Sequence, residues 1–432
     1  MASRLVFRSQ RVQLPGGPRA ADVVVEDGVI TETLHHGAKA DDTPVKEFGN
    51  LILAPGLVDT HVHLNDPGRA DWEGFETGTR AAKAGGITTI VDMPLNSTPV
   101  TTTVDALQAK RSSAGGRIHV DVGFHAGVIP DNTALVGDVI EAGAVAAKAF
   151  MCHSGIHEFP DVGESDLRLA MNELARRNVP LLAHAERIHP VDPMTNPTSY
   201  RQYLQTRPAS FESDAIRLLI ELCEQTGCRT HIVHLADSGC LPMIAQAKAR
   251  GLPLTAETCP HYLFFAAEDI ADGRTDFKCA PPIREAFHRE RLWQGLIDGT
   301  LDLIVSDHSP CPPEMKRIRE GRFDTAWGGI SSLQLGLSII WTQAHQRGIA
   351  FDRIVDWMSR QPAELLGLES GIKVGHQANL FVFDPDATWV VDQNQLHHRH
   401  ALTPYHGHEL RGLVKHTFLR GVDSDEPRGQ ML

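Results

Sequence analysis

Two histidines, His61 and His63, stand one residue apart at the end of an apolar run in the segment LVDTHVHLNDPGR. On an extended backbone, residues i and i+2 point to the same side, so both imidazoles could bind one metal ion from the end of a buried strand. A His-x-His pair alone is weak evidence, because two polar residues at a strand edge give the same pattern. The remaining polar residues on apolar runs therefore have to be considered with it.

Four more residues that can carry metal chemistry interrupt or end other apolar runs. Lys148 lies in AVAAKAF, His184 in VPLLAHAE and His234 in THIVHLA, and Asp307 ends LDLIVSD. Each one alone could be a hydrogen-bonded core residue. Such separate explanations would all have to hold at once, so we interpret the four residues and the histidine pair as one cluster.

The elements that would position this cluster are eight short apolar runs separated by helical patterns. Near-continuous apolar runs are typical of strands buried on both faces. Alternation of strands and helices over roughly 300 residues indicates an α/β fold, a (β/α)₈ TIM-like barrel, whose active site forms where the strands end. A doubly wound open sheet is the alternative, although no GxGxxG motif follows an early strand. The expected strands are residues 57–61, 87–93, 118–124, 144–150, 179–186, 230–236, 252–258 and 301–307, and helical patterns include 73–84, 165–177 and 211–225.

Both ends of the chain contain short apolar or alternating runs with turns between them. ADVVVEDGVI is broken at Asp27-Gly28, a hairpin signal, and similar runs lie at 378–383, 388–391 and 413–421. We expect a small β-sandwich domain formed by residues 1–53 and 366–432, beside a hydrolase barrel of residues 54–365. The histidine-rich LHHRH at 396–400 is expected to be a solvated loop away from the barrel strands.

Composition and charge exclude several classes of partner. The net charge of -13 argues against nucleic acid and anionic membrane surfaces. No stretch approaches 18 consecutive apolar residues, so no spanning helix is expected. The seven cysteines are scattered without a CxxC pair, which indicates reduced thiols. The N-terminal segment lacks the apolar core of a signal peptide, and we expect a cytoplasmic protein with a small-molecule substrate.

Lys148 is the unusual member of the cluster, because an ammonium has no lone pair for a metal and is costly to bury. Desolvation beside cations favours the neutral amine, which can react with CO₂ to form a carbamate. The carbamate is an anion with two oxygens that can bridge two divalent metal ions. Such ions acidify a bridging water, so a hydroxide could attack a carbonyl carbon while Asp307 acts as general base. Imidazole-rich ligation suits zinc, with iron, cobalt or manganese as alternatives.

These residues resemble the cyclic amidohydrolase group of the amidohydrolase superfamily, which includes dihydroorotases, hydantoinases or dihydropyrimidinases, and allantoinases. The resemblance extends from LAPGLVDTHVH to GIKVGHQANLFVFDP. It implies a barrel with a small β-sandwich, two metal ions, a carboxylated lysine and a homo-oligomer, commonly a tetramer. By that pattern His61 and His63 hold the more buried metal, His184 and His234 hold the other, Lys148 bridges them, and Asp307 joins the buried metal and acts as base.

Residues near these ligands distinguish the ring-opening enzymes. Dihydroorotases place an arginine two residues after the second histidine, where this chain has Asn65, and Arg69 is better explained as a surface residue than as a carboxylate clamp. Hydantoinases usually place a tyrosine five residues after the bridging lysine, where this chain has His153. SDHSPCPPEMK and DWEGFETGT resemble allantoinases, which implies hydrolysis of the neutral ring of allantoin to allantoate. The expected substrate contacts are Asn65, Asn96, His153 and backbone groups near Ala280 and Cys311.

Two alternatives stay open on the sequence alone. The enzyme alternative is a hydantoinase or dihydropyrimidinase, with a dihydroorotase less favoured. The non-enzyme alternative is a scaffold homologue without metals, but such a protein should lack ligand residues, and all six are present here.

Overall fold

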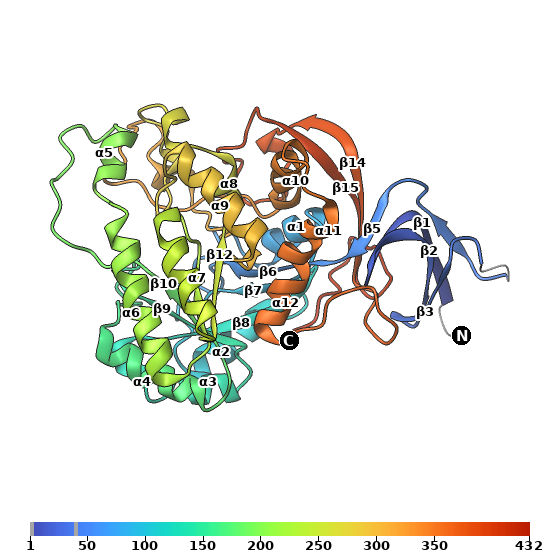
Figure 1. The fold of residues 1–432 in the computed structure, drawn as a ribbon, viewed down its shortest axis with the longest axis horizontal. Coiled ribbons are helices and arrows are strands. Elements are labelled where there is room, and N and C mark those ends of the chain that lie inside the picture. Colours follow the sequence, from blue (N-terminus) through green and yellow to red (C-terminus); the bar gives the residue numbers. More distant parts are fainter. Residues whose placement is uncertain (1–3, 39–41) are drawn as a thin grey trace.

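The computed structural model describes residues 4–38 and 42–432. Residues 1–3 and 39–41, which belong to the predicted terminal domain, lie outside the described residues. Figure 1 shows two parts: parallel strands surrounded by helices, and a β-rich part that contains N-terminal strands in blue and C-terminal strands in red. The predicted α/β architecture is confirmed.

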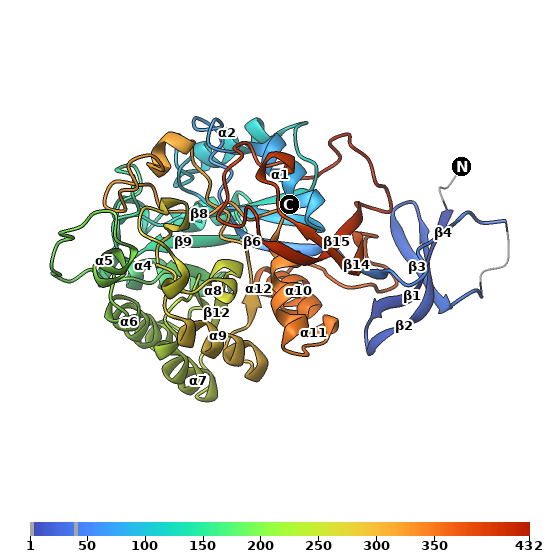
Figure 2. The same ribbon diagram turned by 90° about the horizontal axis from the view of Figure 1, so that it is seen from above.

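Eight parallel strands form the sheet of the barrel, paired in the order β13-β12-β11-β10-β9-β8-β7-β6. The sheet closes through a parallel bridge between Val62 and His308, and the His63 amide donates to the His308 carbonyl at 2.8 Å. Figure 2 shows the helices distributed around these strands. The strands are β6 (Leu57–Val62), β7 (Ile87–Asp92), β8 (Asp121–Gly127), β9 (Ala146–Phe150), β10 (Leu181–His184), β11 (Thr230–Ile232), β12 (Leu254–Thr258) and β13 (Leu303–Ile304).

Several strands end earlier than the apolar runs predict. The runs at 230–236 and 301–307 extend past β11 and β13, and within these extensions His234 and Asp307 adopt positive φ angles of 40° and 44°. A residue with positive φ cannot continue a β-strand. The two side chains that matter most for chemistry are therefore on the loops that follow the strands.

The helices pack apolar faces on the barrel. In the long helix α6, the buried set includes Phe211, Ile216 and Leu219, and the helix ends at Gly227 in the left-handed region. None of the helices in the described residues has the length and apolar character needed to cross a membrane. The helices are α1 (Phe75–Ala84), α2 (Val104–Ala114), α3 (Val136–Glu141), α4 (Glu164–Ala175), α5 (Tyr200–Gln205), α6 (Ser210–Thr226), α7 (Leu241–Ala249), α8 (Pro260–Phe264), α9 (Ala286–Asp298), α10 (Gly336–Gln346), α11 (Phe351–Val355) and α12 (Gln361–Leu366).

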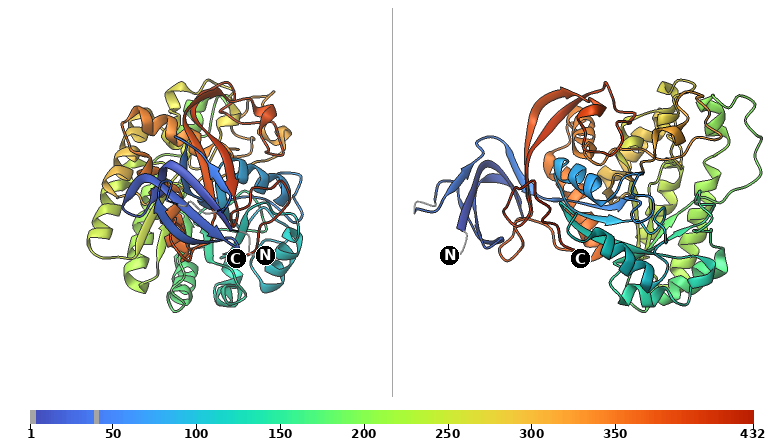
Figure 3. Two further views of the ribbon diagram at one scale, coloured as in Figure 1. Left: turned by 90° about the vertical axis from the view of Figure 1, so that its right-hand side faces the viewer. Right: turned by 180° about the vertical axis from the view of Figure 1, so that it is seen from behind.

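The second sheet combines strands from both ends of the chain, as predicted. Its order is β15-β14-β5-β1-β2-β3, with β4 paired to β1. Phe7, Val23, Leu53 and Phe418 belong to one apolar core that both ends share. The left view of Figure 3 looks from this sheet toward the barrel. The strands are β1 (Arg4–Leu14), β2 (Gly17–Glu26), β3 (Val29–His35), β4 (Val45–Glu47), β5 (Ile52–Pro55), β14 (Leu380–Val390) and β15 (Glu409–Phe418).

The segment LHHRH at 396–400 contacts the barrel and is not a wholly solvated loop. His398 is buried and accepts a hydrogen bond from the Gln334 amide, and the Arg399 guanidinium donates to the Glu73 carbonyl. Because Glu73 also pairs with the buried His308, this segment supports the loop that carries Asp307. The sequence expectation of a loop remote from the barrel strands was wrong for this reason.

Candidate active site

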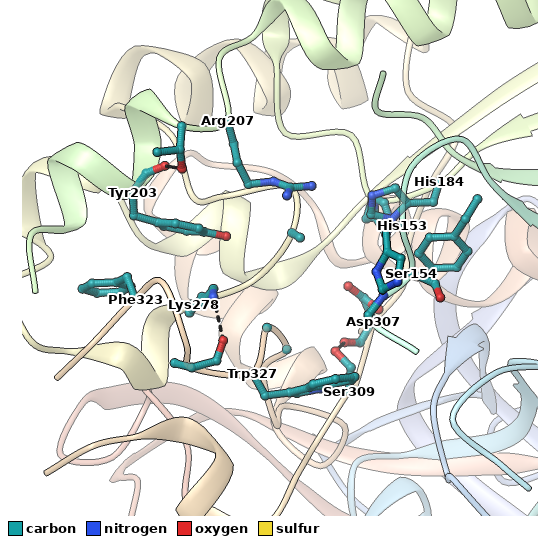
Figure 4. A pocket seen from close by; sticks show the side chains of 18 of the residues that line it. His153, Ser154, His184, Tyr203, Arg207, Lys278, Asp307, Ser309, Phe323 and Trp327 are labelled. Atoms are coloured by element: carbon teal, nitrogen blue, oxygen red, sulfur yellow. Dashed lines mark hydrogen bonds between the residues drawn. The ribbon is translucent and has the colours of Figure 1, made fainter. Parts of the chain in front are cut away.

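A cavity of about 700 Å³ lies where the barrel strands end. Its lining brings together most of the residues singled out from the sequence. Figure 4 shows His184, His153 and Asp307 at one end of this cavity and Tyr203, Phe323 and Lys278 at the other. The predicted residues that line it are His61, His63, Asn96, His153, His184, His234, Ala280 and Asp307.

At the base of the cavity, His61 and His63 converge on one carboxylate. Their Nε2 atoms lie 3.2 and 3.5 Å from Oδ1 of Asp307. On the other side of the first ring, Nδ1 of His61 lies 2.5 Å from Oε1 of Glu257. A carboxylate can only accept a hydrogen bond, so Nδ1 of His61 carries the proton and Nε2 presents a lone pair to Asp307.

The contact between His61 and Asp307 brings two hydrogen-bond acceptors together with no proton between them. A lone pair of His61 Nε2 and an oxygen of Asp307 repel unless a cation lies between them. A second proton on the ring is disfavoured, since burial and the nearby Lys148 lower the pKa of His61 well below its usual range. The donor set therefore fits a divalent metal ion at this position, and His61, His234 and Asp307 have ligand atoms within 4.8 Å of one another.

The other two histidines complete a continuous group of rings. The His234 ring centroid lies 5.4 Å from that of His61 and 4.6 Å from that of His184. His184 stacks on Phe150 with centroids 4.5 Å apart, and its Nε2 lies 2.8 Å from Oε2 of Glu186. Because the carboxylate of Glu186 accepts a hydrogen bond from Nε2, the neutral ring of His184 has its lone pair on Nδ1, which faces away from Glu186. Nδ1 of His63 and Nδ1 of His234 have no hydrogen-bond partner among the described residues, so all four imidazoles have a nitrogen available for ligation.

Lys148 lies fully buried on β9, beside this group. Its Nζ has no hydrogen-bond partner in the part of the chain that the structure describes, and it lies 5.2 Å from the Phe150 ring centroid. Burial lowers the pKa of Lys148 to about 8, against the opposing influence of Glu257 and Asp307. A buried amine without a partner is costly as an ammonium, so the position fits a lysine whose Nζ is used in another form.

Strained backbone conformations are concentrated at this site. Among the residues described, eight non-glycine residues have positive φ, and four of them are in the predicted set: Asn65, Asn96, His234 and Asp307. Such conformations cost free energy and persist where the surrounding structure enforces them, often at functional sites. The strain is therefore independent support for locating the active site here.

The predicted substrate contacts occupy three kinds of position. His153 is exposed on the cavity wall, and its Nδ1 accepts a hydrogen bond from the Gly155 amide at 3.0 Å. Asn96 and Ala280 also line the cavity. Asn65 is buried outside the lining, where its side-chain nitrogen lies 3.5 Å from the Pro310 carbonyl, and Cys311 is buried too. Contact of any of these residues with a substrate stays a prediction.

Arg69, considered above as a possible carboxylate clamp, does not line the cavity. Its guanidinium donates to the Asn96 carbonyl at 3.0 Å and pairs with Glu158 at 2.9 Å. The pairing leaves it as a surface residue that supports the backbone of Asn96.

Sequence reasoning missed the acids behind the histidines and much of the outer cavity wall. Glu186 follows His184 by two residues, so the same-side spacing of an extended segment could have suggested it. Glu257 gave no signal, because its contact with His61 joins residues 196 positions apart. The cavity lining missed from sequence includes Tyr203, Arg207, Phe211, Lys278, Ser309, Phe323 and Trp327.

Part of the outer wall comes from the long loop between β10 and α5. Ile188, Pro193 and Met194 of this loop line the cavity. Figure 1 shows the loop extending on the side opposite the terminal sheet. Its far end is anchored, because the Gly273 amide donates to the Thr198 carbonyl at 2.8 Å.

Comparison with known proteins agrees with this geometry. Residues 52–422 match the model of the amidohydrolase family. An allantoinase from Streptomyces avermitilis is 46% identical, with 99% of this chain and 98% of that protein covered, and an allantoinase from Arabidopsis thaliana is 43% identical, with 96% and 86% covered. The solved L-hydantoinase (dihydropyrimidinase) from Arthrobacter aurescens superimposes with a TM-score of 0.92 at 28% identity over 100% of this chain and 99% of that one. The chain belongs to the amidohydrolase family and, within it, to the allantoinases.

Proposed function

We propose that this protein hydrolyses the ring amide of allantoin to give allantoate. The observation that carries the proposal is the near full-length similarity to allantoinases, combined with a cavity that four histidines and an aspartate line, with the buried Lys148 beside them. The family similarity supplies the reaction class, and the cluster supplies groups that can carry it out.

The metal assignment forms part of the proposal. His61, His63 and Asp307 would hold one divalent cation, His184 and His234 the other, and the carbamate of Lys148 would bridge them. When bound, the two cations would polarise the substrate carbonyl and acidify the attacking water. Two observations support this assignment. Acceptor atoms of His61 and Asp307 face each other, and Nζ of Lys148 has no hydrogen-bond partner among the described residues.

Asp307 is the residue that we assign to proton transfer. It lies beside both Nε2 atoms of the histidine pair and lines the cavity. As water adds to the carbonyl carbon, Asp307 takes its proton, and the C–O bond forms. Asp307 then passes the proton to the ring nitrogen as the C–N bond breaks, which leaves a ureido group and a carboxylic acid that loses its proton to solvent.

His153 is suited to hold the carbonyl oxygen. Because its Nδ1 accepts from the Gly155 amide, the neutral ring carries its proton on Nε2, which is left as a donor. A donor aimed at a developing oxyanion lowers the barrier of acyl transfer. This chain would therefore use an imidazole where hydantoinases place a tyrosine.

Among the described residues, Arg207 is the one guanidinium that lines the cavity, and it is not free to clamp a carboxylate. Arg207 binds Glu186, and Lys278 donates from Nζ to the Ala326 carbonyl at 2.6 Å. Dihydroorotate carries a carboxylate that requires such a clamp, whereas the allantoin ring is neutral. The arrangement favours a neutral cyclic substrate.

We further propose that the metal is zinc, with iron, cobalt or manganese as alternatives. We also propose a cytoplasmic location and a homotetramer. Zinc is favoured by the excess of imidazole ligands over carboxylates. The tetramer is carried over from the family resemblance. Metal analysis of the purified protein and its mass in solution would test these points.

A substrate panel tests the proposed activity. Protein loaded with metal is assayed on allantoin, hydantoin, dihydrouracil and dihydroorotate, and kcat/KM should be highest for allantoin. Dominant turnover of hydantoin or dihydrouracil would favour the hydantoinase alternative, and dominant turnover of dihydroorotate would contradict the argument from Asn65. Absence of any bound transition metal from active protein would contradict the proposed mechanism.

A further inference from the structure

A buried carboxylate, Glu257 on β12, lies between two imidazoles. Its Oε1 is 2.5 Å from Nδ1 of His61, and its Oε2 is 2.8 Å from Nε2 of His231. Oε1 also accepts from the amide of His234 at 3.2 Å. Glu257 therefore contacts two of the proposed ligand residues, one through its ring and one through its backbone.

The chain of hydrogen bonds has a defined direction. Both ring nitrogens that face Glu257 must donate, because a carboxylate has only acceptors. His231, if neutral, then accepts at Nδ1 from the hydroxyl of Thr255, which lies 2.7 Å away. The hydroxyl fixes His231, His231 fixes Glu257, and Glu257 fixes the tautomer of His61.

We propose that Glu257 is a positioning residue of the metal site, which holds the proton of His61 on Nδ1 and thereby aims the Nε2 lone pair at the cation beside Asp307. The proposal rests on the proposed metal site and deepens it. A carboxylate behind a ligating imidazole fixes the ring and makes it a stronger donor. Nothing in the sequence pattern of LPLTAET distinguishes Glu257 from a strand residue.

The ionic partners of Glu257 distinguish it from an ordinary structural acid. Within the described residues, the basic side chains that lie within 4.0 Å of its carboxylate are those two histidines, and no Lys or Arg is among them. By contrast, the buried Glu212 pairs with the guanidinium of Arg284 at 2.6 Å. A buried carboxylate that lacks a Lys or Arg partner is expensive, and it becomes favourable when a cation is bound one ring away.

Metal affinity is the direct test. We compare the dissociation constants of Zn²⁺ for chelator-treated wild type, E257Q and E257L, measured by competition with a coloured chelator. E257Q keeps an acceptor for His61 but loses the charge, so the affinity of the tighter site for Zn²⁺ should fall about 10-fold. E257L loses both the acceptor and the charge, so the affinity should fall about 100-fold. The visible spectrum of the Co²⁺-loaded variants should change with the altered ligand field.

D22N is the matched control, because it also neutralises a buried carboxylate, which pairs with Arg8 in the terminal sheet, away from the histidines and the loop that carries His234. It should leave metal affinity and the Co²⁺ spectrum unchanged, whatever its effect on unfolding. Unchanged affinity in folded E257Q and E257L would overturn the positioning role while leaving the proposed function intact. If the wild-type protein bound no divalent metal, that result would contradict the proposed function itself. If E257L does not fold, E257Q alone decides, and no loss of affinity in it would overturn the proposal.

Discussion

Nε2 of His184 lies 2.8 Å from Oε2 of Glu186, and both oxygens of that carboxylate accept hydrogen bonds from the guanidinium of Arg207. The acid behind His184 is thus neutralised by a fixed cation. The acid behind His61 is shared with a second imidazole. The two halves of the histidine cluster are therefore supported by carboxylates of different effective charge.

Replacing Arg207 with Met should destabilise the metal-free protein by about 3 kcal/mol, because it leaves the fully buried Glu186 without its cation. Denaturant unfolding of chelator-treated protein measures the loss. The double variant E186Q/R207M should recover much of it, since the unpaired charge is gone. Equal stability of wild type and R207M would show that the pair adds nothing.

Asp307→Asn should reduce kcat about 10²- to 10⁴-fold with a much smaller change in KM, because the amide cannot accept the proton of the attacking water. Steady-state kinetics on allantoin are measured at saturating metal, and bound metal is quantified in the same samples. A variant with full metal content and a change mainly in KM would exclude Asp307 as the base.

Lys148→Ala should abolish activity, and short carboxylic acids added to the assay should restore part of it by replacing the carbamate between the cations. Its Nζ has no partner among the described residues, so removing it breaks no hydrogen bond. The acids should not stimulate wild type, which serves as the control. Full activity of the variant without added acid would contradict the bridging role.

Removal of metal should lower the melting temperature, because Asp307 and the Nε2 atoms of the histidine pair then face one another without a cation. A ligand that binds only the folded state stabilises it in proportion to the logarithm of its concentration over Kd. Thermal unfolding with chelator, and again after Zn²⁺ is restored, checks this. No shift in either direction would argue against a metal at this position.

Much of the fold was predictable because barrel strands buried on both faces leave long apolar runs in the sequence. The six proposed ligands were predictable for the same reason: a His or Lys stands out in such a run. The left-handed backbone of His234 and Asp307, which lie beyond the ends of β11 and β13, was not predictable, since it depends on contacts made by the folded barrel. The start of a helix was also predicted only approximately, as α1 begins at Phe75, whereas the helical pattern begins at residue 73.

The supporting acids and the outer cavity wall illustrate a second limit. Glu257 and His61 meet only because β12 and β6 lie in one closed barrel, and the pair leaves no local spacing to detect. Asn65 was singled out because it departs from an arginine, and its side-chain nitrogen lies 3.5 Å from the Pro310 carbonyl, outside the cavity lining. The type of residue at a motif position can thus suggest a substrate class, but it does not predict where the side chain points.

His153→Phe should lower kcat on allantoin about 10²-fold, the cost of losing one oxyanion donor, while His153→Tyr should retain much of the activity. The reason is that Nδ1 of His153 accepts from the Gly155 amide and leaves Nε2–H as the donor at the cavity wall. Tyrosine supplies a hydroxyl donor instead, so H153Y should also gain activity on hydantoin relative to allantoin. His157, whose ring lies 5.8 Å from that of His153 and which is absent from the cavity lining, is the matched control, and H157F should behave as wild type. Unchanged kcat in H153F would remove the imidazole from the mechanism and return the oxyanion to backbone donors.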